Sequence, residues 1–409
     1  MAGQLILPND KPKVHLWFQD PLDFFSGVAT QDHNKSNITY QEIVENAFID
    51  HFKNFSKIKI KIINTDSIDK EAINIAPVVS LSISQFKNNL SSINQDLYNF
   101  CWDNDITLLQ AIPRETIDLA NASDVVDIVQ NCIVNRGYSS KIVKIFYLAY
   151  DIIPALLPIK EYLIYADYFN VFLADYTSRT SPIPTFIKGK KRKYNFSLLA
   201  GQIAQRYYRI LFLANAYEQK LLQSDFFHTT LIKDRDKLNY SINEMIGVND
   251  YPLVKKHFEE NFKHYVVNAD GSELVDKSIY DDQIEYAVPK QVLDSYIHVV
   301  LETQTDIPCL SEKIYKPLMS GLIFIWHGPV NTLQYLESLG FKRYNYIDYS
   351  FDSHPNPNTR LNLLLAEIQR LKKNDLRVLT LLNQRTIEYN QNKFWEISSN
   401  MNHVWKHFK

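Results

Sequence analysis

Cysteine is scarce in this chain of 409 residues, and neither sign of charge is in clear excess. The three cysteines are far apart and odd in number, which excludes a disulfide framework and a cysteine-based metal cluster. A reducing compartment, the cytoplasm, fits this usage. The formal net charge is only -2 at pH 7, so no dense cationic face is available for DNA or RNA. We therefore expect no nucleic-acid partner.

The chain also lacks an uninterrupted apolar run of membrane-spanning length. The longest candidate, 142–159, is broken by Lys144, Asp151 and two prolines, and it reads as a buried core element. The N-terminus has no basic-then-apolar signal region, and we take it as the start of the folded chain. The aromatic and basic segment 394–409 predicts a C-terminal helix docked on its own protein. A peripheral contact with the inner face of a membrane is the alternative.

What is present is ample apolar material arranged as alternating strands and helices. Hydrophobic residues make up 45% of the chain, enough for a large core and for two domains. Short apolar runs separated by helix-length segments predict a mostly parallel sheet in the first part of the chain, with strands at 14–20, 58–63, 77–84 and 106–112. The segment 180–193 then reads as a linker because prolines and cations interrupt every apolar period.

A second α/β unit is predicted after the linker. It begins with a strand at 194–201, followed by a helical window at 203–222. Its last third contains two apolar runs of strand length, 295–301 and 322–328. About twenty residues join these two runs, which suits a parallel crossover through one helix.

Polar residues follow both of these predicted strands. Ligands of open parallel sheets bind beyond the carboxyl ends of the strands, where loops and helix N-termini converge. The residues at this edge are Glu302, Thr303, Ser311, Glu312, Lys313, His327, Gly328 and Asn331, the last as the cap of the next helix.

Lys313 and Glu312 are the most informative of these residues. A cation in the first turn of a helix is disfavoured, so Lys313 calls for a nearby anion, and a diphosphate fits best. Glu312 can accept hydrogen bonds from the vicinal hydroxyls of a sugar or ribose. Pro317 implies a distorted first turn. The alternative is that the pair is merely exposed on an amphipathic helix.

Glycine is rare, with ten residues in the whole chain, and two of them follow predicted helices. Gly321 would end the crossover helix and Gly340 the next one. Neither needs any role beyond that of a helix cap.

The segment 301–341 resembles a known family. It reads LET, then SEKIYKPLMSGLIFI, then HGP, then LQYLESLGF. These pieces are similar to the nucleotide-sugar half of GT-B glycosyltransferases near the family 10 α-1,3-fucosyltransferases and their bacterial and viral relatives. Upstream, 202–217 resembles the arginine-bearing helix of this family, and downstream 347–352 with Arg360 resembles its acidic segment. The resemblance covers roughly 195–365.

The resemblance implies an α/β fold of two Rossmann-like domains facing across a cleft (GT-B), with C-terminal helices. We accordingly expect an acceptor-side domain at 1–185, a nucleotide-sugar domain at 186–365 and a helical extension at 366–409. It implies no metal and no cofactor other than a nucleotide-sugar donor. A GDP-sugar is favoured, and fucose is a candidate for the sugar.

The same resemblance implies the donor contacts. Lys313 and Arg209, or Arg206 as the weaker choice, would hold the diphosphate, and Glu312 would bind hydroxyls. The full expected set is Arg206, Arg209, Glu302, Ser311, Glu312, Lys313, Tyr315, His327, Gly328, Asn331 and Asp348.

The expected reaction is inverting transfer to a hydroxyl of a glycan, a lipid-linked glycan or a protein. A carboxylate would deprotonate the acceptor hydroxyl while the cations stabilise the departing diphosphate. This base should come from the first domain. Asp20, at the carboxyl end of the first predicted strand, is the first choice and Asp23 the second.

Two alternatives remain open. A metal-dependent glycosyltransferase of the GT-A type would use an Asp-x-Asp motif, which 103–105 and 234–236 both spell. A non-catalytic protein that binds a sugar or nucleotide would need the same strand-end polar groups without transferring anything. The pairing of a cation, a carboxylate and an arginine helix exceeds what a neutral sugar requires.

Overall fold

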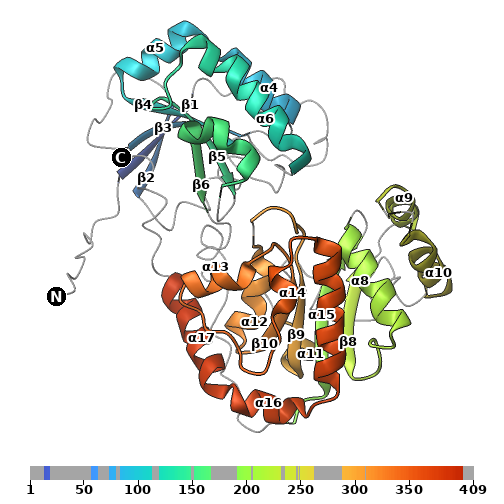
Figure 1. Ribbon diagram of the computed structural model, residues 1–409. Coiled ribbons are helices and arrows are strands. Elements are labelled where there is room, and N and C mark those ends of the chain that lie inside the picture. Colours follow the sequence, from blue (N-terminus) through green and yellow to red (C-terminus); the bar gives the residue numbers. More distant parts are fainter. Residues whose placement is uncertain are drawn as a thin grey trace. The chain divides into compact units, whose positions relative to one another are not determined.

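The structure is a computed structural model. It describes residues 13–18, 57–62, 73–79, 83–112, 119–148, 152–166, 191–203, 206–231, 235–245, 247, 249–261, 288–308 and 310–398. The chain divides into two compact units (Figure 1). The first comprises Met1–Asp175 with Asn400–Lys409, and the second comprises Tyr176–Ser399. The domain boundaries expected from the sequence stay predictions.

The first unit is built on a sheet of six parallel strands. Its strands are β1 (Lys13–Phe18), β2 (Lys57–Ile62), β3 (Ile73–Val79), β4 (Ile106–Ile112), β5 (Val143–Leu148) and β6 (Leu163–Ala166). Their order is β2-β1-β3-β4-β5-β6, and every pairing is parallel. The order reverses direction between β1 and β3, which makes the carboxyl ends of these two strands the switch point of the sheet. The prediction of a mostly parallel α/β sheet is confirmed.

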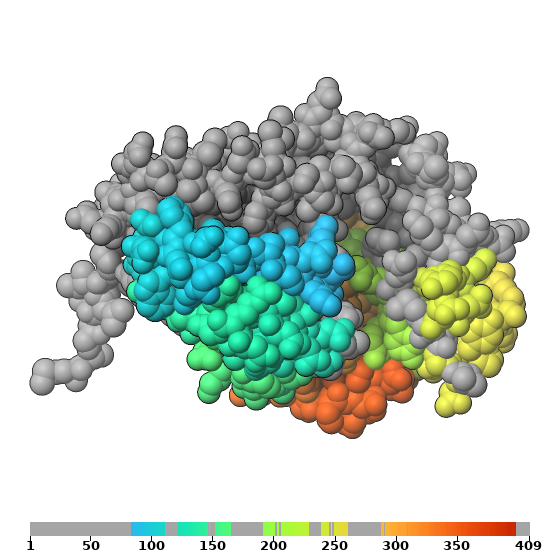
Figure 2. All heavy atoms as spheres, turned by 90° about the horizontal axis from the view of Figure 1, so that it is seen from above, coloured from blue at the N-terminus to red at the C-terminus, as the bar shows by residue number. Residues whose placement is uncertain are grey.

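Helices α4 (Ile83–Ser92), α5 (Gln95–Asp103) and α6 (Leu119–Cys132) accompany this sheet. Figure 2 shows part of the surface of this unit in blue and green. Where α4 meets α6, the hydroxyl of Ser91 lies 3.3 Å from the thiol of Cys132. The strand expected at 77–84 is wrong in its bounds, because β3 begins at Ile73 and the chain is already helical at Ile83.

The segment expected to form a buried core element does so in pieces. It contributes β5 and then η3 (Pro154–Tyr162), a 3-10 segment that leads directly into β6. Ile145, Leu156 and Ile159 are fully buried. Lys144 lies within β5 and both prolines lie within η3, so the apolar material is shared between two short elements of one core.

The second unit contains a four-stranded parallel sheet. Its strands are β7 (Tyr194–Gln202), β8 (Phe226–Leu231), β9 (Ser295–Leu301) and β10 (Ile323–His327), in the order β10-β9-β7-β8. All residues of β9 and β10 are buried, as their continuous apolar runs predict. The chain passes from β7 to β8 on one side and then to β9 on the other, so the switch point lies at the carboxyl ends of β7 and β9.

Ten helices of this unit lie within the described residues. They are α8 (Tyr207–Glu218), α9 (Arg235–Met245), α10 (Tyr251–Asn261), α11 (Lys290–Leu293), α12 (Tyr315–Met319), α13 (Thr332–Ser338), α14 (Ser350–Ser353), α15 (Pro357–Lys372), α16 (Leu376–Leu382) and α17 (Gln384–Ser398). Figure 1 shows α15 and α8 beside the sheet, and α15 contacts both α8 and β10. Among the described helices, none has the length and apolar character needed to cross a bilayer.

The C-terminal helices pack on the second unit. Phe394 of α17 is fully buried, and its ring lies 5.9 Å from that of Tyr315 in α12. The expected docked helix is therefore confirmed for residues 394–398, the part of the predicted segment that lies in α17. The remainder of the aromatic and basic segment, 399–409, lies outside the described residues, and a membrane contact there stays a prediction.

Candidate functional site

Arg209 connects α8 to the end of β9 at the switch point of the second sheet. Its Nη2 donates to the carbonyl of Leu301, at 3.3 Å, and to the hydroxyl of Thr303, at 3.1 Å. Only 5% of Arg209 is exposed. A buried guanidinium is therefore fixed where a parallel sheet of this topology presents its ligand site. Arg206, the weaker choice, occupies the N-cap position of α8 and is half-buried.

A short chain of hydrogen bonds runs from Glu302 to Lys313. The backbone N–H of Ser311 donates to Glu302 Oε1, at 3.3 Å, and the hydroxyl of Ser311 donates to Glu302 Oε2. Nζ of Lys313 lies 2.8 Å from that same hydroxyl oxygen. Glu302 and Ser311 are each 3% exposed, whereas Lys313 is only half-buried. Of these three hydrogen-bonded residues, Lys313 is thus the one that reaches toward the surface.

The crossover between β9 and β10 contains a 3-10 turn rather than a regular first helical turn. The turn η6 (Glu312–Ile314) precedes α12, which has five residues. This confirms the distortion expected from Pro317, because the α-helix begins only at Tyr315 and the proline then falls in its first turn, where its missing N–H is tolerated. So short a helix has little macrodipole, and any attraction for an anion here must come from the ammonium of Lys313.

The structure does not support the prediction that Tyr315 contacts the donor. Its side chain is fully buried between α12 and α17, against Phe394, and offers no surface to a ligand. The side chain of Glu312 lies outside what the structure describes, so its role stays a prediction. Gly321 ends α12 with a φ of +60°, as the sequence suggests.

The end of β10 lies beside the end of β9. The backbone N–H of Glu302 donates to the carbonyl of His327, at 2.8 Å, which joins the two strand ends as expected. The ring of His327 is 1% exposed, and its Nε2 lies 2.9 Å from the carbonyl of Pro357. Burial lowers the pKa of His327 to about 4, so the imidazole is neutral at pH 7 and Nε2–H donates to this carbonyl. His327 therefore contributes no positive charge to a phosphate site.

Asn331 was expected to cap α13, and the structure corrects this. It occupies the N-cap position with a φ of +62°, but its side chain makes no capping hydrogen bond. Asp352 supplies the cap instead, since Oδ2 accepts from the N–H of Leu333 at 2.9 Å while Oδ1 accepts from Nε1 of Trp326 at 2.8 Å. Asn331 itself is exposed.

Arg360 is a second buried guanidinium at this edge, and the family resemblance implies no specific role for it. Its Nη1 donates to the carbonyls of His354 and Pro355, each at 2.8 Å, and its Nη2 donates to the carbonyl of Thr305 at 2.6 Å. It therefore connects the loop after β9 to the start of α15. Nearby, the ring of Tyr208 lies 4.9 Å from that of His327.

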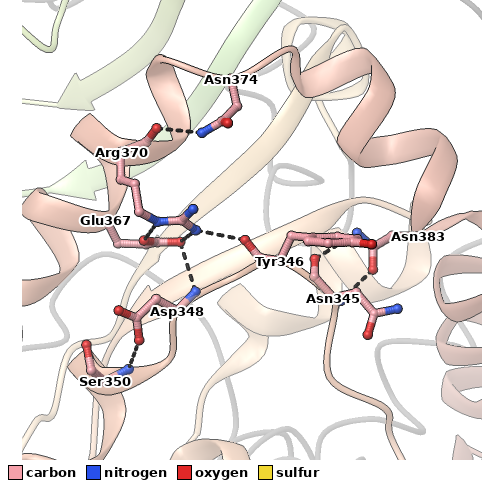
Figure 3. Close-up of polar contacts among 8 residues, drawn as sticks. All are labelled: Asn345, Tyr346, Asp348, Ser350, Glu367, Arg370, Asn374 and Asn383. Atoms are coloured by element: carbon pink, nitrogen blue, oxygen red, sulfur yellow. Dashed lines mark hydrogen bonds and ion pairs between the residues drawn. The ribbon is translucent and has the colours of Figure 1, made fainter.

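Asp348 belongs to a well-bonded loop, drawn in Figure 3. Its N–H donates to Glu367 Oε1, at 3.0 Å, and its Oδ1 accepts from the N–H of Ser350, at 2.9 Å. Arg370 bonds both carboxylate oxygens of Glu367 and the carbonyl of Tyr346. Asp348 is exposed, but its oxygen helps to shape this loop, and its contact with a donor stays a prediction.

The remaining sequence candidates lie elsewhere. Asp20 and Asp23 fall outside the described residues, although β1 ends at Phe18, just before them. Asp105 is exposed, forms an ion pair with Lys141 at 3.0 Å and directly precedes β4, so this Asp-x-Asp spelling lies at the amino edge of its sheet. Of the other spelling, 234–236, the first residue lies outside the described residues and the other two begin α9, where their side chains are not described.

The carboxyl edge of β7, β9 and β10 thus brings together a half-buried ammonium, a buried guanidinium and a buried carboxylate. Gly328, also at this edge, is buried and leaves room for the side chain of Glu302. Positive groups fixed at a switch point can stabilise the charge of a bound or departing anion.

No protein-family model matches the chain, and no curated protein matches it. Three solved structures of α1,3-fucosyltransferase are similar to it in the course of the backbone. The structure with GDP-fucose is 9% identical, with a TM-score of 0.40, and the match covers 98% of this chain and 94% of that one. The structure with GDP is 8% identical, with a TM-score of 0.40, and the third structure is 7% identical, with a TM-score of 0.39; both matches cover 98% of this chain and 95% of the other.

Proposed function

We propose that the protein is a glycosyltransferase that moves a sugar from a nucleoside-diphosphate donor to a hydroxyl acceptor. The donor diphosphate binds at the carboxyl edge of the second sheet, against Lys313 and Arg209. A GDP-sugar is the favoured donor, with fucose as a candidate, and the acceptor is a glycan, a lipid-linked glycan or a protein. Transfer proceeds with inversion and without a metal ion.

One observation carries this proposal. The half-buried ammonium of Lys313 is held by Ser311 at the carboxyl edge where Arg209 bonds the end of β9. Two cations on one edge of a parallel sheet suit two linked phosphates better than a neutral sugar. Both cations can also stabilise the charge that grows on the diphosphate as the glycosidic bond breaks.

The acceptor hydroxyl needs a base, and the first unit is proposed to supply it. In the sequence, Asp20, or Asp23 in second place, comes soon after β1, the strand whose carboxyl end lies at the switch point of the first sheet. A carboxylate there takes the proton of the acceptor oxygen as this oxygen attacks the anomeric carbon.

Incubation with nucleotide sugars tests the proposal. A thermal-shift screen of GDP-, UDP- and CMP-sugars should give one class that raises the melting temperature, since a ligand of the native state stabilises it. With that donor, free nucleoside diphosphate should appear only when a hydroxyl acceptor is added. Binding without nucleotide release in the presence of a broad acceptor panel would instead support a non-catalytic binder.

A chelator distinguishes the metal-dependent alternative. Transfer should continue at an unchanged rate in excess EDTA, because Lys313 and Arg209 are proposed to supply the positive charge at the diphosphate. Loss of transfer on chelation, with recovery on adding Mg²⁺ or Mn²⁺, would favour the GT-A type of mechanism and the Asp-x-Asp motif at 234–236.

A further inference from the structure

We propose that Glu302 is a positioning residue that acts on the donor through Ser311 and Lys313, without touching the donor itself. The sequence reading placed Glu302 among the donor contacts. Only 3% of the residue is exposed, and both carboxylate oxygens accept hydrogen bonds from Ser311. The inference rests on the proposed function, because Lys313 is the group proposed to hold the diphosphate.

The direction of the hydrogen bonds defines the role of each residue. A serine hydroxyl has one proton, and that of Ser311 is donated to Glu302 Oε2. The oxygen of Ser311 can then only accept from Nζ of Lys313, which lies 2.8 Å away. The carboxylate thereby fixes both the rotation of the hydroxyl and the position of the ammonium. An ammonium has three N–H groups, so it can donate to Ser311 and to a phosphate oxygen at the same time.

Glu302 is also held from its other side by the end of β10. Its backbone N–H donates to the carbonyl of His327 at 2.8 Å. A Cβ added at Gly328 would lie only 3.1 Å from Cγ of Glu302. The lack of a side chain at Gly328 therefore gives the Glu302 side chain its place. A donor at this edge therefore meets the half-buried ammonium of Lys313 and not the buried carboxylate of Glu302.

A double-mutant cycle with GDP as the probe tests the inference. Binding to the full chain is measured by isothermal titration calorimetry for the wild type, Glu302→Gln, Lys313→Met and the double variant. Glu302→Gln should weaken GDP binding about tenfold, the order expected for one charge-assisted hydrogen bond. In the Lys313→Met background the same change should have less than about a twofold effect, because the residue through which it acts is gone.

The control and the contrary outcomes are distinct. Glu337→Gln removes another hydrogen-bonded carboxylate of the same unit, that bonded to Arg343, and should leave GDP binding unchanged. Equal losses from Glu302→Gln in the wild-type and Lys313→Met backgrounds would overturn the inference, because they would show a contact independent of the lysine. The inference would also be overturned if Glu302→Gln left the affinity for GDP unchanged while Lys313→Met weakened it.

A second measurement needs no nucleotide and so separates this inference from the proposed function. Lys313 is labelled with a small amine-reactive reagent, and the rate at which its amine is modified is followed by mass spectrometry. The reagent should modify Lys313 severalfold faster in the Glu302→Gln variant and in the Ser311→Ala variant than in the wild type. The exposed Lys255 should react at the same rate in all three proteins. Unchanged labelling of Lys313 in both variants would refute the positioning role. Absence of GDP binding with altered labelling would refute only the proposed diphosphate site.

Discussion

Arg209 shows how the structure changes an expectation at the scale of a single residue. The family resemblance implies only that it holds the donor diphosphate. The structure buries its guanidinium and bonds it to Leu301 and Thr303, so the residue also holds the end of β9. Removing it leaves the Leu301 carbonyl without this donor, and an unsatisfied buried group costs about 1–3 kcal/mol.

Arg209→Lys and Arg209→Ala should therefore differ in a defined way. Lysine keeps the charge but loses the planar fork, so GDP binding should weaken about tenfold, the order of one charge-assisted hydrogen bond, with a modest loss of stability. Alanine should weaken binding further and also lower the melting temperature. Calorimetry and thermal unfolding check both. Full stability of the alanine variant would mean that the two hydrogen bonds contribute little to the fold.

Asp352 gives a pH-dependent prediction at the same scale. Burial raises the pKa of its carboxyl from 3.8 to about 6, although Trp326 and the N–H of Leu333 donate to it. The native state therefore keeps a proton that the unfolded state loses between pH 4 and 6. Over this window the stability falls as the pH rises, by about 3 kcal/mol in total if the whole change in pKa is realised.

Asp352→Asn removes this titration. Its stability relative to the wild type should improve as the pH rises from 4 to 7, as followed by urea unfolding at several pH values. Asp375→Asn is the control, because this exposed carboxylate also caps a helix, α16. A stability difference for Asp352→Asn that is constant with pH would contradict the raised pKa.

At the scale of elements, the sequence predicts best where burial is continuous. The apolar run 295–301 coincides with β9, and 322–328 contains β10, because a strand covered on both faces needs apolar residues at every position. The strand expected at 77–84 begins with Pro77, whereas this proline lies inside β3. Its pairing with β1 has already ended at Ile75, so the missing N–H of the proline is tolerated inside the strand.

Contacts between elements could not be predicted from the sequence alone. The bond from Asp352 to α13 spans 19 residues, and that from Arg360 to Thr305 spans 55. Local patterns carry no information on such distances, because the pairs meet only once the strand order is known. Glu302, Ser311 and Lys313 were predictable from their places after the two strands, whereas Arg209 was predictable only from the family resemblance. The division into exposed and buried roles was not predictable.

The contact between α17 and α12 gives a prediction at the element scale. Phe394 is fully buried against Tyr315, which begins the helix directly after the turn of Lys313. Phe394→Ala should lower the free energy of unfolding by about 3–5 kcal/mol, the usual cost of emptying such a site. GDP affinity should fall as well, because α12 supports the turn. Val378→Ala, at a position 48% exposed, is the matched control and should change neither quantity.

For the molecule as a whole, donor binding and proton abstraction are proposed to belong to different units. Asp20→Asn should therefore slow transfer about 10²- to 10⁴-fold, the usual contribution of a general base, without weakening GDP binding. Lys313→Met should weaken binding and transfer together. Initial rates and calorimetry on the same preparations check this. A loss of GDP affinity in Asp20→Asn as large as in Lys313→Met would contradict the division.

The proposed function depends on Lys313 holding a donor diphosphate at the carboxyl edge of β9 and β10. The most direct measurement is a crystal structure of the full chain with GDP. We expect phosphate oxygens within about 3 Å of Nζ of Lys313, the ordinary distance of a charge-assisted hydrogen bond, while Glu302 still accepts from Ser311. Nucleotide bound elsewhere, with the Lys313 side chain extended into solvent, would contradict it.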